Sequence, residues 1–393
     1  MNNNPSLKHP GFQTSAQLEK LGGALHVGRP NIGDHDAFLR RVEQMLQRRW
    51  LSNDGPMVRE FEQRIAGFLG VRNVVAVCNA TVGIELASKA LGLVGEVIVP
   101  SYTFVATAHA LQWQGITPVF ADMDPATHNI DPEKIEALIT PKTSGIVGVH
   151  VWGRSCDTKT IEAIAATHGL KVMYDASHAF GCSVGTKMIG NFGEAEVFSF
   201  HATKFVNCLE GGAVVTNNDD LAEKMRLMRN FGFKGFDNVV YLGVNGKMNE
   251  VCAAMGLTNF EAMDGIIAAN KRNYLAYCSE LSSVQGISVI SYDPAERNNY
   301  QYVVIEVDPD VCRRNRDEII EALHAENVIA RKYFWPGCHR MEPYRTTQPE
   351  GWKKLPETER VAARVIVLPT GQTVDEETVR RVCGIIKKAV KRV

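Results

Sequence analysis

The sequence predicts an α/β fold, in which helices cover both faces of a mostly parallel sheet and a smaller α+β region follows. Short apolar runs alternate with helical segments from about residue 74 to residue 216, and this alternation is typical of parallel sheets. After Phe260 the pattern changes to segments that alternate like antiparallel strands. The 393 residues exceed what one core usually organises. We therefore expect an N-terminal arm over 1–33, a large domain over 34–262 and a small domain over 263–393.

The predicted large domain begins with two helices and then alternates strands with helices. Apolar residues at helical spacing predict helices over 34–50 and 57–69. Residues 1–33 show no regular pattern, so we expect them to wrap the surface or a partner subunit. The predicted strands cover 74–78, 96–100, 117–121, 145–150 and 171–174, and the predicted helices between them include 83–91 and 107–113.

The predicted small domain opens with a long helix that runs through Arg272 toward Leu281. Alternating residues predict antiparallel strands over 287–290 and 299–307. Helices follow over 317–327 and 375–390. This order of elements favours an α+β unit packed on the first domain.

Composition and charge exclude several classes of function. The net charge is −1, and no basic stripe predicts a nucleic-acid partner or a membrane surface. No apolar run is long enough to span a bilayer, and residues 1–25 lack a signal-peptide pattern. The nine cysteines form no CxxC pair, which favours reduced thiols in a cytoplasmic protein over disulfides or a metal site.

A lysine between two β-runs is the strongest single signal. Lys204 ends the segment Phe198-Ser199-Phe200-His201-Ala202-Thr203-Lys204, and Glu210-Gly211-Gly212 leads into a second β-branched run. A half-buried lysine loses its charge easily, so its amine can attack carbonyl groups, as in pyridoxal phosphate (PLP) enzymes. The alternative is a surface lysine in a β-turn, and this segment alone favours neither.

Three further segments place candidate cofactor groups at the ends of predicted strands. Cys78-Asn79-Ala80-Thr81-Val82-Gly83 offers backbone amides and a hydroxyl at a helix N-terminus, where a phosphate can bind. Phe104 follows the next strand and can stack on a planar ring. Asp175 and His178 follow the strand over 171–174. A carboxylate there can partner a protonated pyridine nitrogen, and the histidine can support it or bond the phenolic oxygen of PLP.

Each of these residues also has an ordinary structural alternative. Asn79 or Thr81 can simply cap a helix, and Phe104 can fill a core. Asp175 can be a cap, and His178 a satisfied core histidine. Taken together, however, a phosphate loop, a stacking aromatic, an aspartate and a lysine all follow strand ends. Ligands of open α/β sheets bind at that edge, so we expect a PLP site there.

With these residues in view, the chain resembles the DegT/DnrJ/StrS family of PLP-dependent nucleotide-sugar aminotransferases, from about Arg29 to Lys387. The resemblance implies the aspartate aminotransferase (type I) fold and a homodimer whose active sites lie at the subunit interface. The motifs that carry it are Leu51-Ser52-Asn53, Pro100-Ser101-Tyr102-Thr103-Phe104, Asp175-Ala176-Ser177-His178-Ala179, Ser199-Phe200-His201-Ala202-Thr203-Lys204, Glu210-Gly211-Gly212, Arg229-Asn230-Phe231-Gly232 and Gly243-Val244-Asn245-Gly246-Lys247-Met248-Asn249-Glu250.

By position, the resemblance makes Lys204 the catalytic Schiff-base lysine. It makes Asp175 the partner of the pyridine nitrogen of PLP. Phe104 would stack on the cofactor ring, and His178 would lie near its phenolic oxygen.

The resemblance also implies which residues hold the cofactor phosphate. Ala80, Thr81 and Ser199 would bind it, helped by Asn245 from the neighbouring subunit. Asn230 is a weaker assignment at the same interface. Near Asn245, the apolar stretch 251–257 is expected to form an interface helix, because such a surface is costly to expose.

Departures from the family pattern are mild. Asn79-Ala80-Thr81 stands where Ser-Gly-Thr is commoner, and Ala80 still has an amide to donate. Leu209 and Gly246 also replace the usual residue types. Lys204 is intact, whereas the dehydratase branch of this fold replaces this lysine with histidine.

Within the family, two segments look most like enzymes that aminate C4 of a nucleotide-linked 4-keto-6-deoxyhexose. The implied substrate is dTDP-4-keto-6-deoxy-D-glucose, with L-glutamate as amino donor, and the product is an amino sugar for a surface polysaccharide or an antibiotic. Aromatic rings can stack on the base or sugar and cations can bind the diphosphate, although the aromatic residues can equally be interdomain packing. The candidate substrate contacts are Lys247, Tyr333, Trp335, His339 and Arg340.

Other functions stay open at this point. The enzyme can be a C3 aminotransferase or a PLP-dependent dehydratase on a related sugar, and the intact Lys204 disfavours the dehydratase. A PLP-binding regulatory protein without turnover is a further alternative. The intact lysine, aspartate and phosphate loop argue against it, as does the lack of a basic patch.

Overall fold

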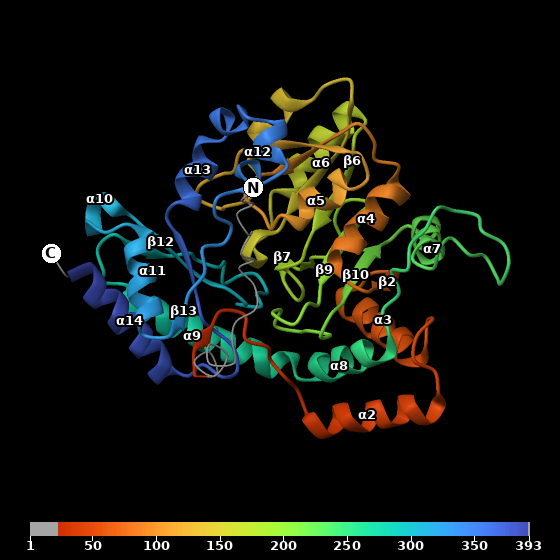
Figure 1. Ribbon diagram of the computed structural model, residues 1–393, viewed down its shortest axis with the longest axis horizontal. Helices are drawn as coiled ribbons and strands as arrows, with labels where there is room; N and C mark the ends of the chain where they lie inside the picture. Colours follow the sequence, from red (N-terminus) through yellow and green to blue (C-terminus); the bar gives the residue numbers. More distant parts are fainter. Residues whose placement is uncertain (1–22, 392–393) are drawn as a thin grey trace, which may run out of the picture.

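The computed structural model describes residues 23–391 (Figure 1). Its centre is a seven-stranded sheet in the order β2-β10-β9-β6-β5-β3-β4. Only β10 runs antiparallel to its neighbours β2 and β9, so the predicted mostly parallel sheet is confirmed. The strands are β2 (Asn73–Val77), β3 (Glu96–Pro100), β4 (Thr117–Ala121), β5 (Thr143–Val149), β6 (Lys171–Asp175), β9 (Ala195–Ser199) and β10 (Gly212–Thr216).

Alternate residues of each strand point to opposite faces, and each face has its own helices. Along β2, Val75 and Val77 join the core beneath α4, α5 and α7, whereas Val74 and Ala76 join the core beneath α3 and α8. Because both faces are covered, the strands are continuous apolar runs. The helices over the sheet are α3 (Pro56–Leu69), α4 (Ala80–Leu91), α5 (Ala106–Gln112), α6 (Thr158–His168), α7 (Asp219–Met228) and α8 (Glu250–Glu261).

The apolar stretch 251–257 is not an exposed interface helix, and that prediction is wrong. It lies in α8, where residues 252–257 are all buried. Both α2 (His35–Arg48) and α3 pack against α8 within the same chain. A helix that is apolar on all sides is normally buried in its own core, so its composition carried no information about a partner.

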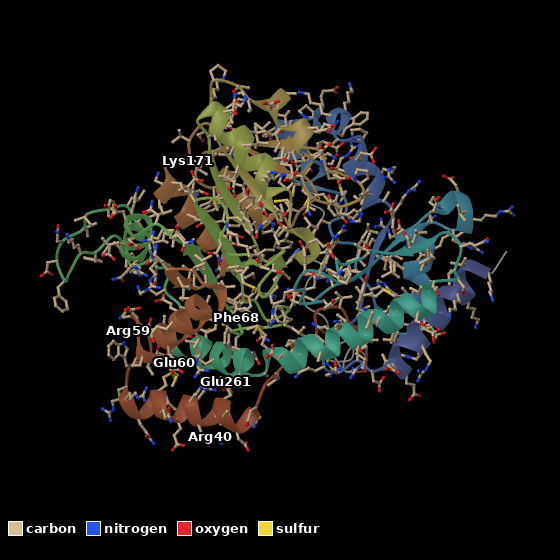
Figure 2. All side chains as sticks on the ribbon, turned by 180° about the vertical axis from the view of Figure 1, so that it is seen from behind. Arg40, Arg59, Glu60, Phe68, Lys171 and Glu261 are labelled. Carbon is tan, nitrogen blue, oxygen red and sulfur yellow. The ribbon has the colours of Figure 1, made fainter. Side chains whose placement is uncertain are left out.

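Exposed ion pairs join α2, α3 and α8 on the back of the molecule. Glu60 on α3 and Glu261 at the end of α8 are both labelled in Figure 2. Arg64 pairs with Glu60 at 2.6 Å and with Glu261 at 2.7 Å, and Arg41 of α2 pairs with Glu261 at 2.6 Å. Such exposed pairs contribute little to stability individually. The three helices are therefore held together mainly by their packing against one another.

The second half of the chain builds a separate antiparallel sheet in the order β11-β12-β14. The predicted strands and helices of this region are confirmed, although the division at residue 262 stays a prediction. β12 begins later than predicted, because Tyr300 has a φ of 49°, which a strand does not adopt. The side-chain amide of Asn299 donates to the carbonyls of His178 and Phe180, at 2.8 and 3.0 Å. The elements are α9 (Met263–Leu281), β11 (Ile287–Val289), β12 (Val303–Val307), α11 (Arg316–Ala325), β14 (Val365–Leu368) and α14 (Glu376–Lys391).

The described part of the arm lies along the body of the protein. β1 (Leu25–His26) pairs in parallel with β13 (Val328–Ile329). Residues 1–22 of the predicted arm lie outside the described residues. The remaining short elements are β7 (Ser183–Val184), β8 (Lys187–Met188), α10 (Pro309–Cys312), α12 (Tyr344–Thr347) and α13 (Pro356–Ala362).

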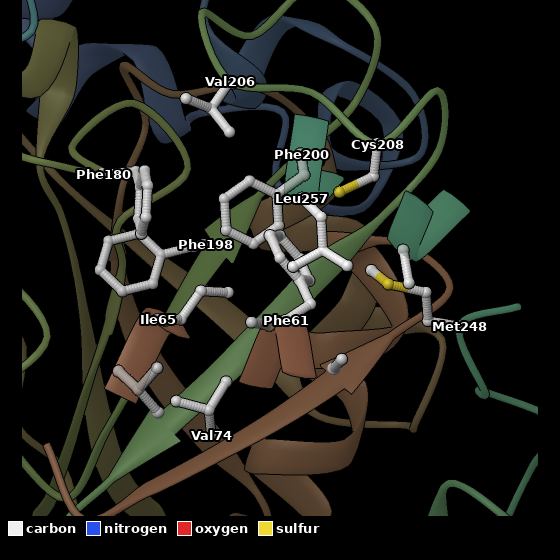
Figure 3. Packing of buried hydrophobic residues seen from close by; sticks show 14 of the residues in the cluster. Phe61, Ile65, Val74, Phe180, Phe198, Phe200, Val206, Cys208, Met248 and Leu257 are labelled. Carbon is white, nitrogen blue, oxygen red and sulfur yellow. The ribbon is translucent and has the colours of Figure 1, made fainter. Parts of the chain in front are cut away.

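An aromatic cluster supports the end of β9, as Figure 3 shows. Phe200 is fully buried and contacts Phe61 of α3 edge to face, at 5.3 Å between ring centroids, and Phe180 at 5.1 Å. Such contacts add roughly 0.5–1.5 kcal/mol each beyond burial. They fix the point where the loop after β9 leaves the sheet.

None of the helices between residues 23 and 391 is long and apolar enough to cross a membrane.

Candidate active site

A cleft of about 610 Å³ opens at the carboxyl ends of the parallel strands. Tyr302, Arg331, Tyr333 and Phe334 from the second half of the chain close its other side. Seven of the eight predicted cofactor residues line it, and only Asn245 does not. The seven are Ala80, Thr81, Phe104, Asp175, His178, Ser199 and Lys204.

Lys204 lies in the loop between β9 and β10. Its side chain is half-buried, and Nζ donates to Tyr302 Oη at 3.5 Å. Burial lowers the pKa of the Lys204 amine to about 8, although Asp175 acts in the opposite direction. Near pH 7 about a tenth of the amine is then neutral, against well under a thousandth for an ordinary lysine. The structure therefore gives Lys204 the character of a nucleophile.

Asp175 ends β6 and is 5% exposed. Its Oδ2 accepts a hydrogen bond from Thr107 Oγ1 at 2.7 Å, and its Oδ1 accepts one from Ser177 N at 3.1 Å. A buried carboxylate needs such donors or a cation. No ion pair of Asp175 is found between residues 23 and 391, so the carboxylate can still take a cationic partner from a ligand.

His178 is buried beside Lys204. Its Nδ1 accepts a hydrogen bond from the Trp152 amide at 3.3 Å, which leaves the ring proton on Nε2. Burial, and then the charge of Lys204, hold the pKa of His178 well below its usual value. His178 is therefore a neutral hydrogen-bond donor.

The N-terminus of α4 forms the phosphate-binding part of the cleft. Asn79 caps the helix, accepting a hydrogen bond from the Val82 amide at 2.9 Å. The amides of Ala80 and Thr81 lie in the first turn, where helices have no internal acceptor. A Cβ on Gly212 would lie 2.7 Å from Ala80 N, so only glycine lets β10 pass this close.

Ser199 and Phe104 complete the set of predicted cofactor residues. Ser199 ends β9, and its Oγ accepts from the His201 amide at 3.4 Å. The ring of Phe104 is 58% exposed although it lies in the cleft. An exposed aromatic ring in a cleft offers a face to a planar ligand.

Three buried asparagines anchor the far side of the Lys204 loop. Asn31 donates to Phe205 O at 3.3 Å, and its own backbone oxygen accepts from Asn207 Nδ2 at 2.8 Å. Asn259 of α8 donates to Asn207 O at 2.8 Å. Asn31 Oδ1 also accepts from the Gln372 amide at 3.0 Å. Asn31 therefore joins the Lys204 loop to the loop that precedes α14.

The two predicted aromatic substrate residues, Tyr333 and Trp335, differ in their relation to the cleft. Tyr333 lines it, beneath the guanidinium of Arg331 at 5.0 Å. Trp335 is 47% exposed and stacks on Arg316 at 5.0 Å, but it does not line this cleft.

His339 and Arg340 lie outside the cleft. His339 is buried, with Nδ1 2.6 Å from Ser101 Oγ and Nε2 2.5 Å from Glu359 Oε1. Arg340 makes two hydrogen bonds to Glu359, at 2.7 and 2.9 Å. His339 thus links Ser101, which precedes Phe104, to Glu359, and Arg340 is bound to the same carboxylate, so a substrate contact would have to break these bonds.

Asn230, Asn245 and Lys247 lie together but away from the Lys204 cleft of the same chain. Asn230 and Asn245 form a β-bridge, and Lys247 Nζ donates to Asn230 Oδ1 at 2.9 Å. Lys247 also sits over the ring of Phe231 at 4.7 Å. Burial, and then the charge of Arg229, lower the pKa of Lys247.

Sequence reasoning missed Thr107, Tyr302, Arg331 and Asn31. Thr107 was placed in a predicted helix and Tyr302 in a predicted strand, with no local sign of a role. Only the tertiary structure brings them to Asp175 and to the Lys204 loop.

The cleft fits PLP by its donor set. Two first-turn amides and a hydroxyl can hold a phosphate, Phe104 offers a ring face, and a buried carboxylate is available to a pyridinium nitrogen. Lys204 supplies an amine of lowered pKa. Fold and site together define a PLP-dependent aminotransferase of the type I fold.

The chain belongs to the DegT/DnrJ/EryC1/StrS aminotransferase family, whose model matches residues 33–387. It is 36% identical over 364 residues to a dTDP-4-amino-4,6-dideoxy-D-glucose transaminase of Shigella dysenteriae, covering 93% of this chain and 98% of that protein. It is also 36% identical over 308 residues to the GDP-perosamine synthase of Caulobacter vibrioides, covering 77% and 82%. The crystal structure of DesI in the presence of its TDP-sugar product matches with a TM-score of 0.90 at 50% identity, covering 94% and 93%.

Proposed function

We propose that this protein transfers the amino group of L-glutamate to the C4 keto carbon of a nucleotide-linked 4-keto-6-deoxyhexose. The favoured acceptor is dTDP-4-keto-6-deoxy-D-glucose. The observation that carries the proposal is Lys204, an amine of lowered pKa in the same cleft as the buried carboxylate of Asp175. The Shigella transaminase and DesI support the sugar class.

In this proposal each cofactor contact has one task. Lys204 would hold PLP through its amine, and the same amine would take and return the proton of the substrate carbon. Asp175 keeps the pyridine nitrogen protonated, while Thr107 holds that carboxylate in place. When bound, PLP supplies a ring that withdraws electrons from the substrate carbon.

The remaining contacts hold and orient the cofactor. The amides of Ala80 and Thr81 and the hydroxyl of Ser199 bind its phosphate. Phe104 would offer its face to the ring, and His178 would offer Nε2–H to the phenolic oxygen. Because His178 stays neutral, it donates this hydrogen bond without adding a charge.

The substrate contacts in this proposal divide between two places. Tyr333 lies at the mouth of the cleft and can stack on the base or the sugar. Lys247 does not line the cleft, although its backbone bridges Val77 just before the phosphate-binding turn, and its amine can bind a diphosphate.

We propose a homodimer with shared active sites. The segment between α7 and α8 extends from the body in Figure 1 and exposes apolar side chains, among them Phe236 (97% exposed) and Leu242 (76% exposed). Exposed apolar surface of this kind is typical of an interface. The same segment carries Asn245, which is exposed in this chain and would reach the phosphate of the partner's cofactor.

The nine cysteines support a reducing compartment, and we propose the cytoplasm. All nine are free thiols, and disulfides persist mainly in oxidising compartments.

The test is to incubate the PLP-loaded protein with L-glutamate and a panel of dTDP-, UDP- and GDP-linked keto sugars, and to identify the products by mass spectrometry and NMR. We expect an amino group at C4 of the dTDP-linked 4-keto sugar. A C3 amino product or loss of water would select one of the alternative reactions. The Lys204→Ala variant should give no product, whereas Lys171→Ala, an exposed lysine outside the cleft, should react normally.

A further inference from the structure

A second side chain contacts the reactive amine of Lys204. Tyr302 precedes β12, and its hydroxyl oxygen accepts from Lys204 Nζ at 3.5 Å. It is 8% exposed and lines the cleft. Its ring is held edge-on to Trp152 at 5.3 Å and tilted against His178 at 4.7 Å. Tyr302 therefore reaches Lys204 from the second half of the chain in a fixed orientation.

The Tyr302 phenol stays neutral. Burial raises its pKa well above the usual value, the nearby Tyr333 adds to this, and Gln301 opposes it only in part. A neutral phenol can accept one hydrogen bond and donate another. Besides the hydrogen bond from Lys204, the hydroxyl also interacts with the side chain of Gln301.

No other hydrogen bond of the Lys204 amine is found among the described residues. The oxygens of Asp175 accept from Thr107 and Ser177, and Asp175 acts on Lys204 through its charge. His178 Nδ1 accepts from the Trp152 amide. Among the described residues, Tyr302 is the sole hydrogen-bond partner of Nζ. The other charged or titratable groups that line the cleft are His201, Glu210, Arg331 and Tyr333.

We infer that Tyr302 is a positioning residue for Lys204: it accepts a hydrogen bond from Nζ and thereby turns the amine's lone pair toward the substrate carbon. The inference rests on the proposed function, in which Lys204 moves the proton. The proton passes only between Nζ and the substrate carbon, and Tyr302 keeps its own. A hydrogen-bond acceptor favours the ammonium form of an amine, so removing the Tyr302 oxygen should lower the pKa of Lys204.

The test replaces Tyr302 by phenylalanine, which keeps the ring contacts and removes the oxygen. The matched control is Tyr344→Phe, since the Tyr344 hydroxyl is buried, has no hydrogen-bond partner and lies outside the cleft. The first measurement is the rate at which PLP attaches to the stripped full-length protein as a function of pH. We expect the apparent pKa of Lys204, about 8 in the parent, to fall by about half a unit or more in Tyr302→Phe and to stay unchanged in Tyr344→Phe.

The second measurement is steady-state kinetics of the holoenzyme with L-glutamate and the keto sugar. Misplaced catalytic groups lower the chemical rate more than binding, so kcat should fall roughly ten- to a hundredfold while KM changes little. If Tyr302→Phe does not fold, 3-fluorotyrosine at position 302 serves instead, because it keeps the shape and makes the oxygen a weaker acceptor. The pKa of Lys204 should then also fall, but by less than in Tyr302→Phe.

An unchanged Lys204 pKa together with an unchanged kcat would overturn the inference. A raised KM with a normal kcat would also overturn it, because Tyr302 would then contact the substrate rather than Lys204. These results leave the proposed function intact when the parent enzyme still aminates the sugar. If the parent fails to aminate any sugar, the pH dependence of PLP attachment still decides the role of Tyr302.

Discussion

Thr107 donates its hydroxyl hydrogen to Asp175 Oδ2 at 2.7 Å, across 68 residues of sequence. The contact joins the start of α5 to the end of β6 beside the cofactor cleft. Oδ2 and Oδ1 each accept one hydrogen bond, from Thr107 and from the Ser177 amide. Each oxygen keeps a second lone pair, so the carboxylate can still accept from the pyridine nitrogen.

Replacing Asp175 by asparagine should preserve cofactor binding and slow the reaction. Asparagine keeps the size but cannot keep the pyridine nitrogen protonated. We expect kcat to fall by roughly 10²–10⁴-fold, as measured by rapid-quench kinetics with L-glutamate. Since Asp175 raises the pKa of Lys204, that pKa should also fall in the variant. Full activity in Asp175→Asn would give Asp175 a structural role only.

Replacing Lys204 by alanine should abolish both covalent attachment and turnover. Borohydride should trap PLP on the Lys204 peptide of the parent and on no peptide of the variant. Turnover should fall at least by the roughly 10²–10⁴-fold that general acid–base catalysis contributes. The control Lys171→Ala should retain both properties, and near-normal turnover in Lys204→Ala would exclude it as the catalytic base.

PLP attachment should depend on pH through the Lys204 amine, because only the neutral form attacks the aldehyde. Because the pKa of Lys204 is about 8, the rate of PLP attachment should rise about tenfold per pH unit below pH 8 and level off above it. Stopped-flow absorbance of the stripped protein mixed with PLP measures this profile. A midpoint near the ordinary lysine value, about 10.4, would mean that the amine is not desolvated.

Shared active sites can be tested by mixing two inactive variants. Lys204→Ala and Asn245→Asp should each be inactive, the second because a carboxylate repels the cofactor phosphate. In a mixed dimer, both lesions fall on the same site and the other site is intact. Refolded mixtures should therefore regain activity in about half of the randomly formed dimers. Subunits that demonstrably exchange without regaining activity would show that Asn245 does not serve the partner's site.

Asn31 should matter for both stability and cofactor binding. Asn31→Ala leaves the Phe205 carbonyl and the Gln372 amide without partners, which costs about 1–3 kcal/mol in the free energy of unfolding. It should also weaken PLP binding, because the Lys204 loop loses an anchor. Urea unfolding and PLP titration measure the two effects. The neighbouring Ile32→Ala, at a side chain that is 55% exposed, should change little, and equal effects of the two variants would contradict this role.

The local sequence pattern predicted the residues proposed to bind the cofactor and most strands of the central sheet. Lys204, Asp175 and the α4 N-terminus follow strand ends, and parallel strands bring those ends to one edge. The predicted strand over 96–100 coincides with β3, because a continuous apolar run bounded by polar residues has few other structures open to it.

Long-range partners could not be predicted in this way. Nothing near Thr107 or Tyr302 in the sequence indicates Asp175 or Lys204, since these pairs form only when separate elements pack. The sequence predicts His339 as a substrate contact, but Ser101 and Glu359, which come from other segments, bind both of its ring nitrogens in the buried site. In α8 the composition could not distinguish burial within the chain from burial against another chain.

The hydrogen bonds of Asn31 can form only in a certain order while the chain is being synthesised. Asn31 emerges from the ribosome 341 residues before Gln372, whose amide it binds. At common synthesis rates that interval is roughly 17–70 seconds. Before Gln372 is made, Asn31 can already bond Phe205 and Asn207 of the Lys204 loop. Only the connection from that loop to the segment before α14 must wait, so it is completed late in synthesis although Asn31 is made early.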